Sequence, residues 1–350
     1  IIQQAKKVKN FVDPFCGSAS VVWFDADNID NRILAGELQM YAVSLAESVI
    51  GRTTKVDTTT LLQWIHDAKS TYLKNPIILD QKDPFAYVQN SRTFCSKSRG
   101  NIIMKAYGGY YFSPEQAKKI DILLRSLPEQ YTLKNIATSA LIMASTLCVA
   151  SPGHTAQPFQ PTEKGIRFIL ESWTRDPFVY VERAIVEINR HCSKIKGNAI
   201  VGNAENLINS ANEGDLVFLD PPYSGVHYSR FYHVLETIAR NEKINVSGRG
   251  RYPDTDKRPR SDFSMKGTSL KAFDTLLQKV AAKDASAIIT FPATECSNGL
   301  DGETVKLISK KYFKVKKDII KGTFSTLGGN KVNRPARQSS SELILLLEPK

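Results

Sequence analysis

The sequence has few cysteines, no C-x-x-C pair and no long hydrophobic run. Its five cysteines are odd in number and scattered, which argues against a disulfide scaffold and a zinc site and favours a reducing compartment. The longest weakly polar run, 137–150, contains four hydroxyl side chains, is too short to span a bilayer and predicts a buried helix. The opening residues have no apolar stretch before a cleavage site, so no secretory signal is expected.

The chain also has no internal repeat and no low-complexity tract. Of its 350 residues 42% are hydrophobic, which predicts one large globular domain or a domain that carries an insertion. Lysine and arginine total 47 against 35 acidic residues, a net charge of +12. This surplus favours a polyanionic partner such as nucleic acid, although basic surfaces also occur for solubility alone.

The first fifty residues follow the order strand, turn, helix, strand, helix. Residues 8–13 and 32–36 are predicted strands, and 38–50 has the apolar spacing of a helix. An open α/β sheet usually begins in this way.

Residues 51–196 interrupt the pattern, because no strand of similar quality occurs there. The helices predicted in this region are 58–73, 114–126, 133–150 and 176–192. Strand signals return at 199–202, 215–220, 286–291 and 342–348, with a helix at 229–241. We therefore predict a core of residues 1–50 and 197–350, with a helical insertion, 51–196, as a candidate target-recognition domain.

The sharpest chemical signal is Asp220-Pro221-Pro222-Tyr223, which ends the predicted strand 215–220. In open parallel sheets, ligands bind outside the carboxyl ends of the strands. The two prolines fix the backbone, so the neighbouring carbonyls and the Asp220 carboxylate can accept hydrogen bonds from an amino group. Tyr223 offers a flat face on which a base can stack. The alternative is an ordinary turn, because Asp-Pro and Pro-Pro are common turn dipeptides.

A second turn of small residues, DPFCGSAS at 13–20, follows the first strand. Gly17, Ser18 and Ala19 would let a ligand approach the backbone, and the next helix presents free N–H groups. Glu37 follows at the end of the next strand, where an acid commonly binds ribose hydroxyls. The alternatives are a plain strand-helix corner for the turn and a helix N-terminal acid for Glu37.

In this order, DPFCGSAS (13–20), GELQMYA (36–42) and FLDPPYS (218–224) resemble the N6-adenine DNA methyltransferases of the D12 class. The resemblance extends over nearly the whole chain through YGGYYFSPEQA, DPPYSGVHYSRFYHVLE, STLGGNKVNR and ELILLLEPK. DPPY is typical of the adenine-N6 enzymes, whereas cytosine-N4 enzymes look more like SPPY. Cytosine-C5 enzymes need a Pro-Cys nucleophile, which this sequence lacks, so Cys16 is interpreted as turn filler.

The resemblance implies an α/β fold of the class I S-adenosylmethionine-dependent methyltransferases, a Rossmann-like mixed sheet whose last strand is antiparallel. It also implies S-adenosylmethionine as the methyl donor and no metal. The residues implied for the donor site are Asp13, Phe15, Gly17, Ala19, Glu37, Asn203, Ala204 and Asp220. The family often has an acid where Asn203 stands and more often has glycine where Ala19 stands.

One motif of the family is expected to be missing or replaced. The family usually carries a glycine-rich stretch before the first of these motifs, which supports the methionine end of the donor. Only ten residues precede Phe11 here. A DNA-binding protein with a degenerate donor site therefore remains an alternative.

The implied reaction is methyl transfer to N6 of an adenine flipped out of double-stranded DNA. The implied catalytic residues are Asp220, Pro221, Pro222 and Tyr223. Asp220 and the Pro221 carbonyl would accept the two N6 hydrogens, and Tyr223 would receive the flipped ring. No covalent enzyme intermediate is needed, so catalysis would rest on positioning and electrostatics.

Basic residues in two regions are candidates for DNA contacts. Segment 246–268 is expected to be a mobile loop of the core that contacts phosphates, with a solvated surface loop as the alternative. The residues proposed for contact are Arg249, Arg251, Arg258 and Arg260, together with Arg99 and Lys105 of the insertion. Tyrosines 107, 110 and 111 fit packing and contact with DNA equally well. For His154, a capped loop is favoured over a contact with DNA. For the basic stretch 314–337, a solvated face is favoured over phosphate contacts near 325–330.

Such an enzyme most often protects DNA from a partner nuclease, so double-stranded DNA and a cognate restriction endonuclease are the expected partners. The expected location is cytoplasmic and nucleoid-associated, without a membrane. An RNA adenine-N6 methyltransferase is the nearest alternative. A protein-glutamine methyltransferase would more naturally have Asn-Pro-Pro-Tyr and less basic surface.

Overall fold

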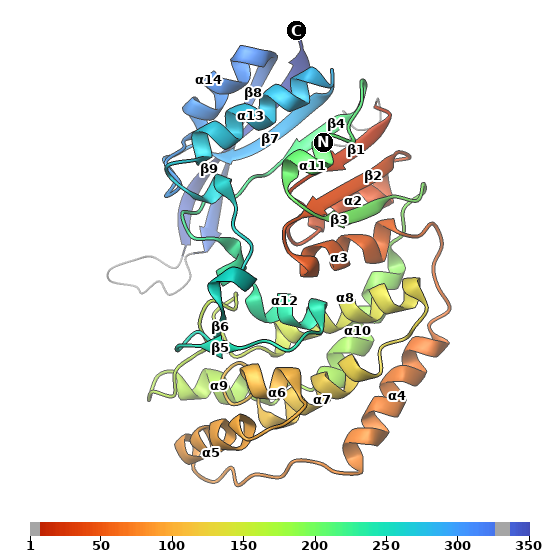
Figure 1. Ribbon diagram of the computed structural model, residues 1–350, viewed down its shortest axis with the longest axis vertical. Helices are drawn as coiled ribbons and strands as arrows, with labels where there is room; N and C mark the ends of the chain where they lie inside the picture. The colour runs from red at the N-terminus through yellow and green to blue at the C-terminus, as the bar shows by residue number, and fades with distance from the viewer. Residues whose placement is uncertain (1–7, 326–336) are drawn as a thin grey trace. The chain divides into compact units, whose positions relative to one another are not determined.

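The computed structural model describes residues 8–325 and 337–350, which divide into two compact units (Figure 1). The sheet unit consists of the residues up to 54, 191–228 and those from 259 onward. The helical unit consists of residues 55–190 and 229–258. Residues 229–258, which the sequence analysis places in the core, thus cluster with the insertion.

The sheet unit contains a seven-stranded sheet in the order β3-β2-β1-β4-β7-β9-β8. Its strands are β1 (Asn10–Asp13), β2 (Arg32–Glu37), β3 (Asn198–Val201), β4 (Leu216–Leu219), β7 (Ser286–Pro292), β8 (Phe313–Ser325) and β9 (Arg337–Pro349). The first five strands of this order pair in parallel, whereas β9 runs antiparallel to both β7 and β8. The α/β fold class with an antiparallel last strand is therefore confirmed.

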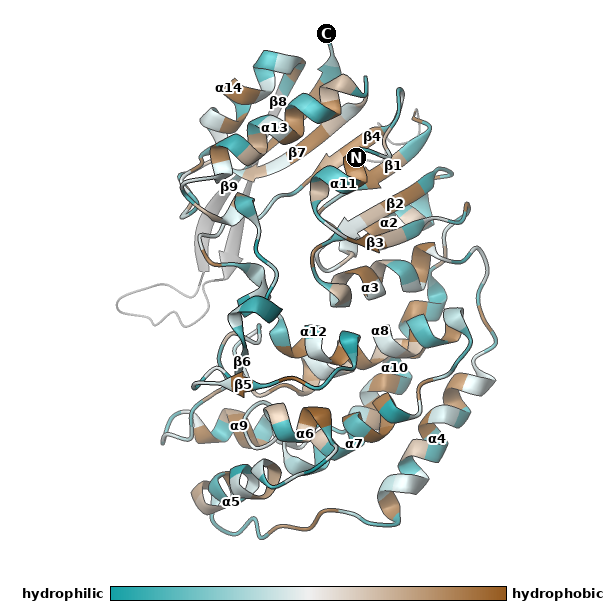
Figure 2. Cartoon of the chain, in the orientation of Figure 1, coloured by the Kyte–Doolittle hydropathy of each residue, from teal (hydrophilic) through white to brown (hydrophobic). Residues whose placement is uncertain are grey.

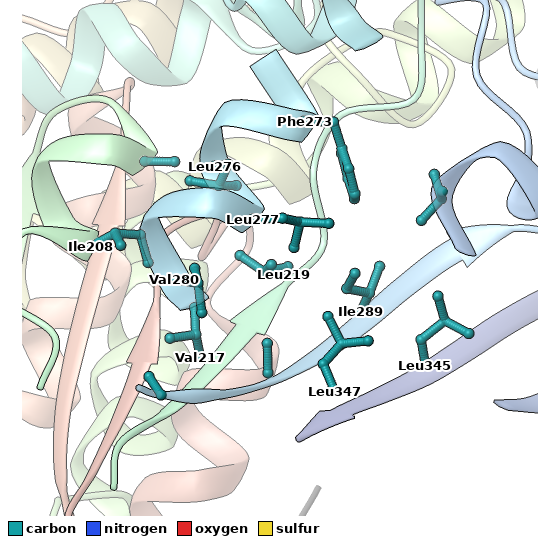
Figure 3. Close-up of a cluster of buried hydrophobic side chains, with 14 of the residues drawn as sticks. Ile208, Val217, Leu219, Phe273, Leu276, Leu277, Val280, Ile289, Leu345 and Leu347 are labelled. Atoms are coloured by element: carbon teal, nitrogen blue, oxygen red, sulfur yellow. The ribbon is translucent and has the colours of Figure 1, made fainter. Parts of the chain in front are cut away.

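The central strands are apolar because they are covered on both faces. All four residues of β4 are buried. Val217 and Leu219 point into a cluster formed with the helices α11 (Ala204–Ile208), α13 (Ser269–Ala282) and α14 (Gly302–Tyr312) (Figure 3). Phe218 alternates with them and lies 6.3 Å from the Phe11 ring, centroid to centroid, on the opposite face. The helices α2 (Ser20–Asn28) and α3 (Met40–Ile50) pack together and against β2.

The helical unit is built around α8, which packs against α10 and α12. Its helices are α4 (Thr59–Leu73), α5 (Pro84–Ser96), α6 (Ile102–Tyr107), α7 (Pro114–Arg125), α8 (Tyr131–Cys148), α9 (Ile166–Trp173), α10 (Pro177–Arg190) and α12 (His233–Arg240). A two-stranded hairpin, β5 (Val246–Ser247) and β6 (Tyr252–Pro253), follows α12. Brown and teal residues alternate along the helices in Figure 2, as expected of helices with one buried face.

Local signals explain several of these elements. Ser113 begins α7 with a reciprocal cap, in which its Oγ accepts from the Gln116 N–H at 3.1 Å and its own N–H donates to Gln116 Oε1 at 3.0 Å. Short 3-10 turns occur at η1 (Tyr228–Arg230), η2 (Thr255–Lys257) and η3 (Asp262–Ser264), so the helix predicted at 229–241 begins only at His233. Among the helices of the described ranges, none is long and apolar enough to cross a membrane.

The place of α12 in the helical unit has a direct cause. The Tyr107 hydroxyl lies 2.9 Å from Thr237 Oγ1, and both groups are buried. The Tyr111 hydroxyl lies within hydrogen-bond distance of the carbonyls of Thr155 and Gly250, at 2.7 and 2.9 Å. These bonds join residues that are far apart in sequence, which is why the sequence pattern alone does not show them.

Candidate active site

Four adjacent parallel strands of the sheet unit end at one edge. Asp13 of β1 is in register with Ala35 of β2, and Glu37 of β2 is in register with Val201 of β3. Asp220 directly follows β4, which pairs with β1. The turn after Asp13, Glu37, the residues after Val201 and Asp220 therefore follow neighbouring strand ends, where open sheets bind ligands.

The turn after β1 is held by its own backbone and by β2. The buried Asp13 carboxylate accepts a hydrogen bond from the Phe15 N–H at 3.1 Å. The Cys16 N–H donates to the Gly36 carbonyl of β2 at 3.1 Å. Burial raises the pKa of the Cys16 thiol well above its usual range, so the thiol is protonated at neutral pH and suits a filler rather than a nucleophile.

Two residues of this turn have left-handed backbone conformations. Gly17 has φ of 49°, and Ala19, the residue before α2, has φ of 61°. Glycine adopts such angles without a steric cost, whereas the alanine methyl group resists them. The family's preferred glycine at position 19 therefore fits the backbone, and Ala19 places a fully buried methyl group there.

Three carboxyl groups, Asp13, Glu37 and Asp220, lie near one another at this edge. Burial is the main reason why the pKa of Asp13 lies well above its usual range. The Phe15 N–H opposes the shift, and the charges of Asp220 and Glu37 add to it. Such a group of carboxylates favours a ligand that brings positive charge or hydrogen-bond donors. Within the described ranges, no three His, Cys, Asp or Glu side chains are grouped to hold a metal ion.

The other residues implied for the donor site have visible local roles. Glu37 is partly buried, and its Oε1 accepts from the Leu38 N–H at 2.7 Å. Asn203 caps α11, because its Oδ1 accepts from the Asn206 N–H at 2.9 Å. The side chain of Ala204 is packed in the hydrophobic cluster, so only its backbone is available to a ligand.

Asp220 is held from the neighbouring strand. The Thr290 hydroxyl on β7 donates to Asp220 Oδ1 at 3.0 Å. Part of the Asp220 side chain is exposed, yet the surrounding protein withdraws the carboxyl from water and raises its pKa to about 6. The Thr290 hydrogen bond opposes this rise, and the charge of Glu342 adds to it. The carboxylate is therefore ionised at neutral pH and becomes protonated just below it.

The backbone after Asp220 is fixed by a buried amide. Asn298, which is fully buried, donates through Nδ2 to the Pro222 carbonyl at 3.2 Å and to the Phe263 carbonyl at 3.0 Å. Pro221 is also buried. The loop is thus rigid by covalent structure, through its prolines, and by this hydrogen bond.

A series of aromatic rings leads from the turn after β1 to Tyr223. The centroid distances are 5.1 Å for Phe15 to Phe263, 6.4 Å for Phe263 to Phe273, 6.3 Å for Phe273 to Phe291 and 6.5 Å for Phe291 to Tyr223. Tyr223 meets Phe291 edge-on and stays 44% exposed, which leaves ring surface for stacking.

Sequence analysis missed two residues that contact the Asp220 loop, Thr290 and Asn298. The sequence does contain a signal for Thr290, because this polar residue stands between Ile289 and Phe291 in the apolar strand SAIITF. No pattern marks Asn298, which stands in a loop and reaches Pro222 only through the fold.

The basic candidates do not gather in one unit. Arg260 is in the sheet unit, and the other five are in the helical unit. Arg251 donates to the carbonyls of Ala106 and Lys105 at 2.8 and 3.1 Å, and its Cζ lies 4.7 Å from the Tyr110 ring centroid. Arg251 thus fixes the hairpin to α6.

The remaining arginines of segment 246–268 differ in exposure. Arg249 and Arg260 are exposed. Arg258 is partly buried, donates to Thr255 Oγ1 at 2.9 Å and lies 5.8 Å from the Tyr252 ring centroid. This segment contains the hairpin β5–β6 and two short 3-10 turns.

For several residues the sequence left packing and DNA contact as alternatives, and the structure shows that their side chains are packed. Tyr107 and Tyr111 are fully buried. His154 lies 4.8 Å from the Phe231 ring, and its Nδ1 accepts from the Ala156 N–H at 3.2 Å. In the late basic stretch, Lys316 pairs with Glu348 at 2.8 Å, which fits a solvated face. Residues 326–336, with Lys331 and Arg334, lie outside the described residues, as do the side chains of 317–325 and 337–340.

Known proteins resemble this chain along much of its length. The family model "D12 class N6 adenine-specific DNA methyltransferase" matches residues 1–290. The chain is 26% identical over 272 residues to "Modification methylase StsI" of Streptococcus sanguinis, which covers 77% of this chain and 38% of that protein. It is 29% identical over 174 residues to "Modification methylase LlaI" of Lactococcus lactis subsp. lactis, covering 49% of this chain and 26% of that protein.

A third relative is "Type II methyltransferase M.FokI" of Planomicrobium okeanokoites, 26% identical over 209 residues. That match covers 57% of this chain and 30% of the relative. The chain therefore spans well under half the length of these three proteins.

Proposed function

The chain belongs to the D12 class of N6 adenine-specific DNA methyltransferases, and on this premise we propose that it transfers a methyl group from S-adenosylmethionine to N6 of an adenine in a specific double-stranded DNA sequence. The observation that carries the proposal is the common sheet edge of Asp220, Glu37 and the turn after Asp13. Because the relatives are named modification methylases, we further propose a role in a restriction-modification system.

The residues at this edge fit S-adenosylmethionine, which is a sulfonium cation. Glu37 and Asp220 place carboxylates near the buried Asp13, and a cation is attracted to them. Gly17 has no side chain, so a ligand can lie close to the backbone of the turn at this position. When bound, the donor supplies an electrophilic methyl group.

Each implied donor-site residue has a role that its surroundings allow. Glu37 would hold the ribose hydroxyls, because a carboxylate at the end of β2 can accept hydrogen bonds from them. Phe15 would pack against the donor from the first turn. Asn203 already caps α11, so we assign the contact with the donor's adenine to the backbone at Asn203 and Ala204.

Adenine N6 is a poor nucleophile, because its lone pair is delocalised into the ring. Hydrogen-bond acceptors at the end of β4 can counteract this. The Asp220 carboxylate and the Pro221 carbonyl would accept the two N6 hydrogens and draw the nitrogen toward a tetrahedral form. One proton would then pass to Asp220, whose pKa of about 6 lets it release that proton to water at neutral pH. The exposed ring of Tyr223 would stack on the flipped base.

The test is nucleoside mass spectrometry of unmethylated genomic DNA after incubation with the protein and S-adenosylmethionine. We expect N6-methyladenine from the unaltered protein and a yield at least about 100-fold lower from Asp220→Asn, which keeps the shape and removes the charge. Asp284→Asn, an exposed position of the same unit, is the matched control.

Sequencing of the modified sites would then give the target. DNA that is bound but acquires no N6-methyladenine would contradict the proposal and favour a degenerate donor site. A parallel incubation with RNA separates the two substrates, because methylation of RNA alone would replace DNA in the proposed function.

A further inference from the structure

A pocket of about 400 Å³ lies in the helical unit, between the segment that leads into α6 and the loop after α12. Its lining residues are Arg99, Gly100, Asn101, Ile102, Lys105, Lys243, Ile244 and Asn245. Three of these eight are cations, none is acidic and none is aromatic. The pocket therefore suits a small anionic group rather than a stacked base.

The three cations are not neutralised by protein carboxylates. In the part of the chain that the structure describes, Arg99, Lys105 and Lys243 form no ion pair, and all three are exposed. By contrast, Arg190 and Arg240 of the same unit pair with acids on their own helices. Like charges around one pocket repel each other, so an anion that enters it relieves that repulsion.

The walls of the pocket are fixed by other residues. Asp121 accepts hydrogen bonds from the N–H groups of Ile102, Ile103 and Met104, each at 2.9 Å, and so holds the start of α6. Those three amides are used, so α6 offers the pocket the side chain of Lys105 rather than its N-terminal N–H groups. Arg251 of the hairpin donates to the Lys105 carbonyl and fixes the same helix from its other end.

We propose that this pocket binds one phosphodiester of the DNA backbone through Arg99, Lys105 and Lys243. The proposal rests on the proposed function, because it takes DNA as the substrate. The pocket volume accommodates a phosphate with part of its sugar, and charge-assisted hydrogen bonds to three cations would hold it. Contacts of this kind position a protein on the duplex and are independent of sequence.

The first test measures DNA affinity without the methyl donor, by fluorescence anisotropy over a range of salt concentrations. Arg99→Gln and Lys243→Gln should each weaken binding by about 3- to 10-fold and lower the slope of log affinity against log salt by about one. The loss should be equal for target and unrelated duplexes. Lys69→Gln, an exposed lysine of α4, is the matched control. Unchanged affinity and slope in both variants would overturn the proposal.

The second test locates the phosphate. Duplexes that carry a single uncharged methylphosphonate are scanned along the site. At one position the methylphosphonate should weaken DNA binding by the unaltered protein but should not weaken it further in Lys243→Gln. Both changes remove the same contact at that position. If the affinity losses from the methylphosphonate and from Lys243→Gln add at every position, the proposed contact is contradicted. Inorganic phosphate at constant ionic strength should not displace DNA; displacement would identify a site for free phosphate instead.

These measurements also separate this proposal from the proposed function. If the pocket variants bind DNA normally and adenine methylation is intact, the pocket proposal is contradicted and the proposed function stands. If the variants bind DNA more weakly but the unaltered protein does not methylate DNA, the pocket proposal stands and the proposed reaction is contradicted.

A separate observation in the sheet unit concerns Thr290. Its hydroxyl donates to Asp220 Oδ1 at 3.0 Å from the adjacent strand β7. We infer, on the basis of the proposed function, that Thr290 is a positioning residue, which occupies one carboxylate oxygen and leaves the other to accept an N6 hydrogen. The titratable groups that face Asp220 are Asp13 from β1, Glu342 from β9 and Tyr223 from its own loop.

Thr290→Val removes the hydroxyl and keeps the shape, and Thr290→Ser restores it. Without this hydrogen bond, the ionised form of Asp220 loses a stabilising donor, so its pKa rises further above about 6. We expect the acid limb of the kcat profile to move to higher pH in Thr290→Val and kcat at pH of about 7 to fall by about 10-fold. Thr290→Ser should restore both.

The KM for DNA should stay the same in both variants. A Thr290→Val enzyme with the unaltered pH profile would overturn the inference, even if its turnover is lower. Urea unfolding of both variants checks that the fold is retained.

Discussion

The two units of this protein use charge in opposite ways. In the sheet unit, the candidate residues are carboxylates at strand ends, and the protein around Asp13 and Asp220 raises their pKa. In the helical unit, the candidates are cations that lie on tyrosine rings or around an open pocket. A carboxyl group whose pKa is raised by the surrounding protein suits proton transfer, whereas exposed cations suit the neutralisation of an extended anion. From this contrast we expect that substitutions in the sheet unit alter the reaction and that substitutions in the helical unit alter DNA binding.

The largest effect should come from Asp220→Asn, which tests whether turnover is confined to the sheet unit. We expect kcat to fall by about 100-fold or more while the Kd for DNA changes by less than about 3-fold. Single-turnover kinetics and anisotropy on the same preparation measure both quantities. Arg99→Gln is the reciprocal case, with weaker binding and normal kcat at saturating DNA. A parallel loss of binding and turnover in Asp220→Asn would break the contrast.

The next largest effect should come from Glu37→Gln, which tests whether donor binding and the chemical step depend on different residues of the sheet unit. Loss of a charged hydrogen bond to the ribose should raise the Kd for S-adenosylmethionine by about 10- to 30-fold, with unchanged DNA affinity. Isothermal titration calorimetry measures the donor affinity. Glu213→Gln, an exposed position before β4, should behave as the unaltered protein. Normal donor binding by Glu37→Gln would return Glu37 to the role of a helix N-terminal acid.

A smaller effect is expected from charge reversal in segment 246–268. Arg258→Glu changes the helical unit and Arg260→Glu changes the sheet unit. The double variant should bind DNA about 5- to 10-fold less tightly, with a salt slope reduced by about two. Each single variant shows how far its own unit contributes. An unchanged slope in the double variant would remove this segment from the DNA footprint.

The smallest effect should come from Ala19→Gly, which measures the strain in the turn of the sheet unit. Glycine relieves the left-handed backbone at φ of 61°, while loss of one buried methyl group opposes that gain. The free energy of unfolding should therefore change by less than about 1 kcal/mol. Ala26→Gly, at a buried and ordinary position of α2, should cost about 2 kcal/mol, and urea unfolding compares the two. Equal losses would show that the turn stores no strain.

Much of the sheet and its edge could be predicted from the sequence. The strands β1, β2, β4 and β7 are short apolar runs, and the prolines after Asp220 mark where one of them ends. The strand β8 was missed because its alternating lysines were interpreted as a solvated face. Phe313 and Val315 pack into the hydrophobic cluster, while Lys314 and Lys316 alternate with them, which is the period of a strand.

The contacts that complete the site depend on tertiary structure. Asn298 reaches the Pro222 carbonyl from a loop that follows another strand. Residues 229–258 join the helical unit through bonds such as Tyr107 to Thr237, which no local pattern reveals. Sequence patterns show which residues end a strand, but they do not show which distant side chain will hold them.

The path of the chain has a consequence for engineering and for recombination. The chain passes between the units four times, after residues 54, 190, 228 and 258. The helical unit is therefore not a detachable cassette, since it is encoded by two separated stretches, 55–190 and 229–258. A transplant of one stretch alone would separate Tyr107 from Thr237 and leave a buried hydroxyl without its partner. Exchange of the helical unit between relatives by a single crossover would meet this barrier, whereas two matched splices would not.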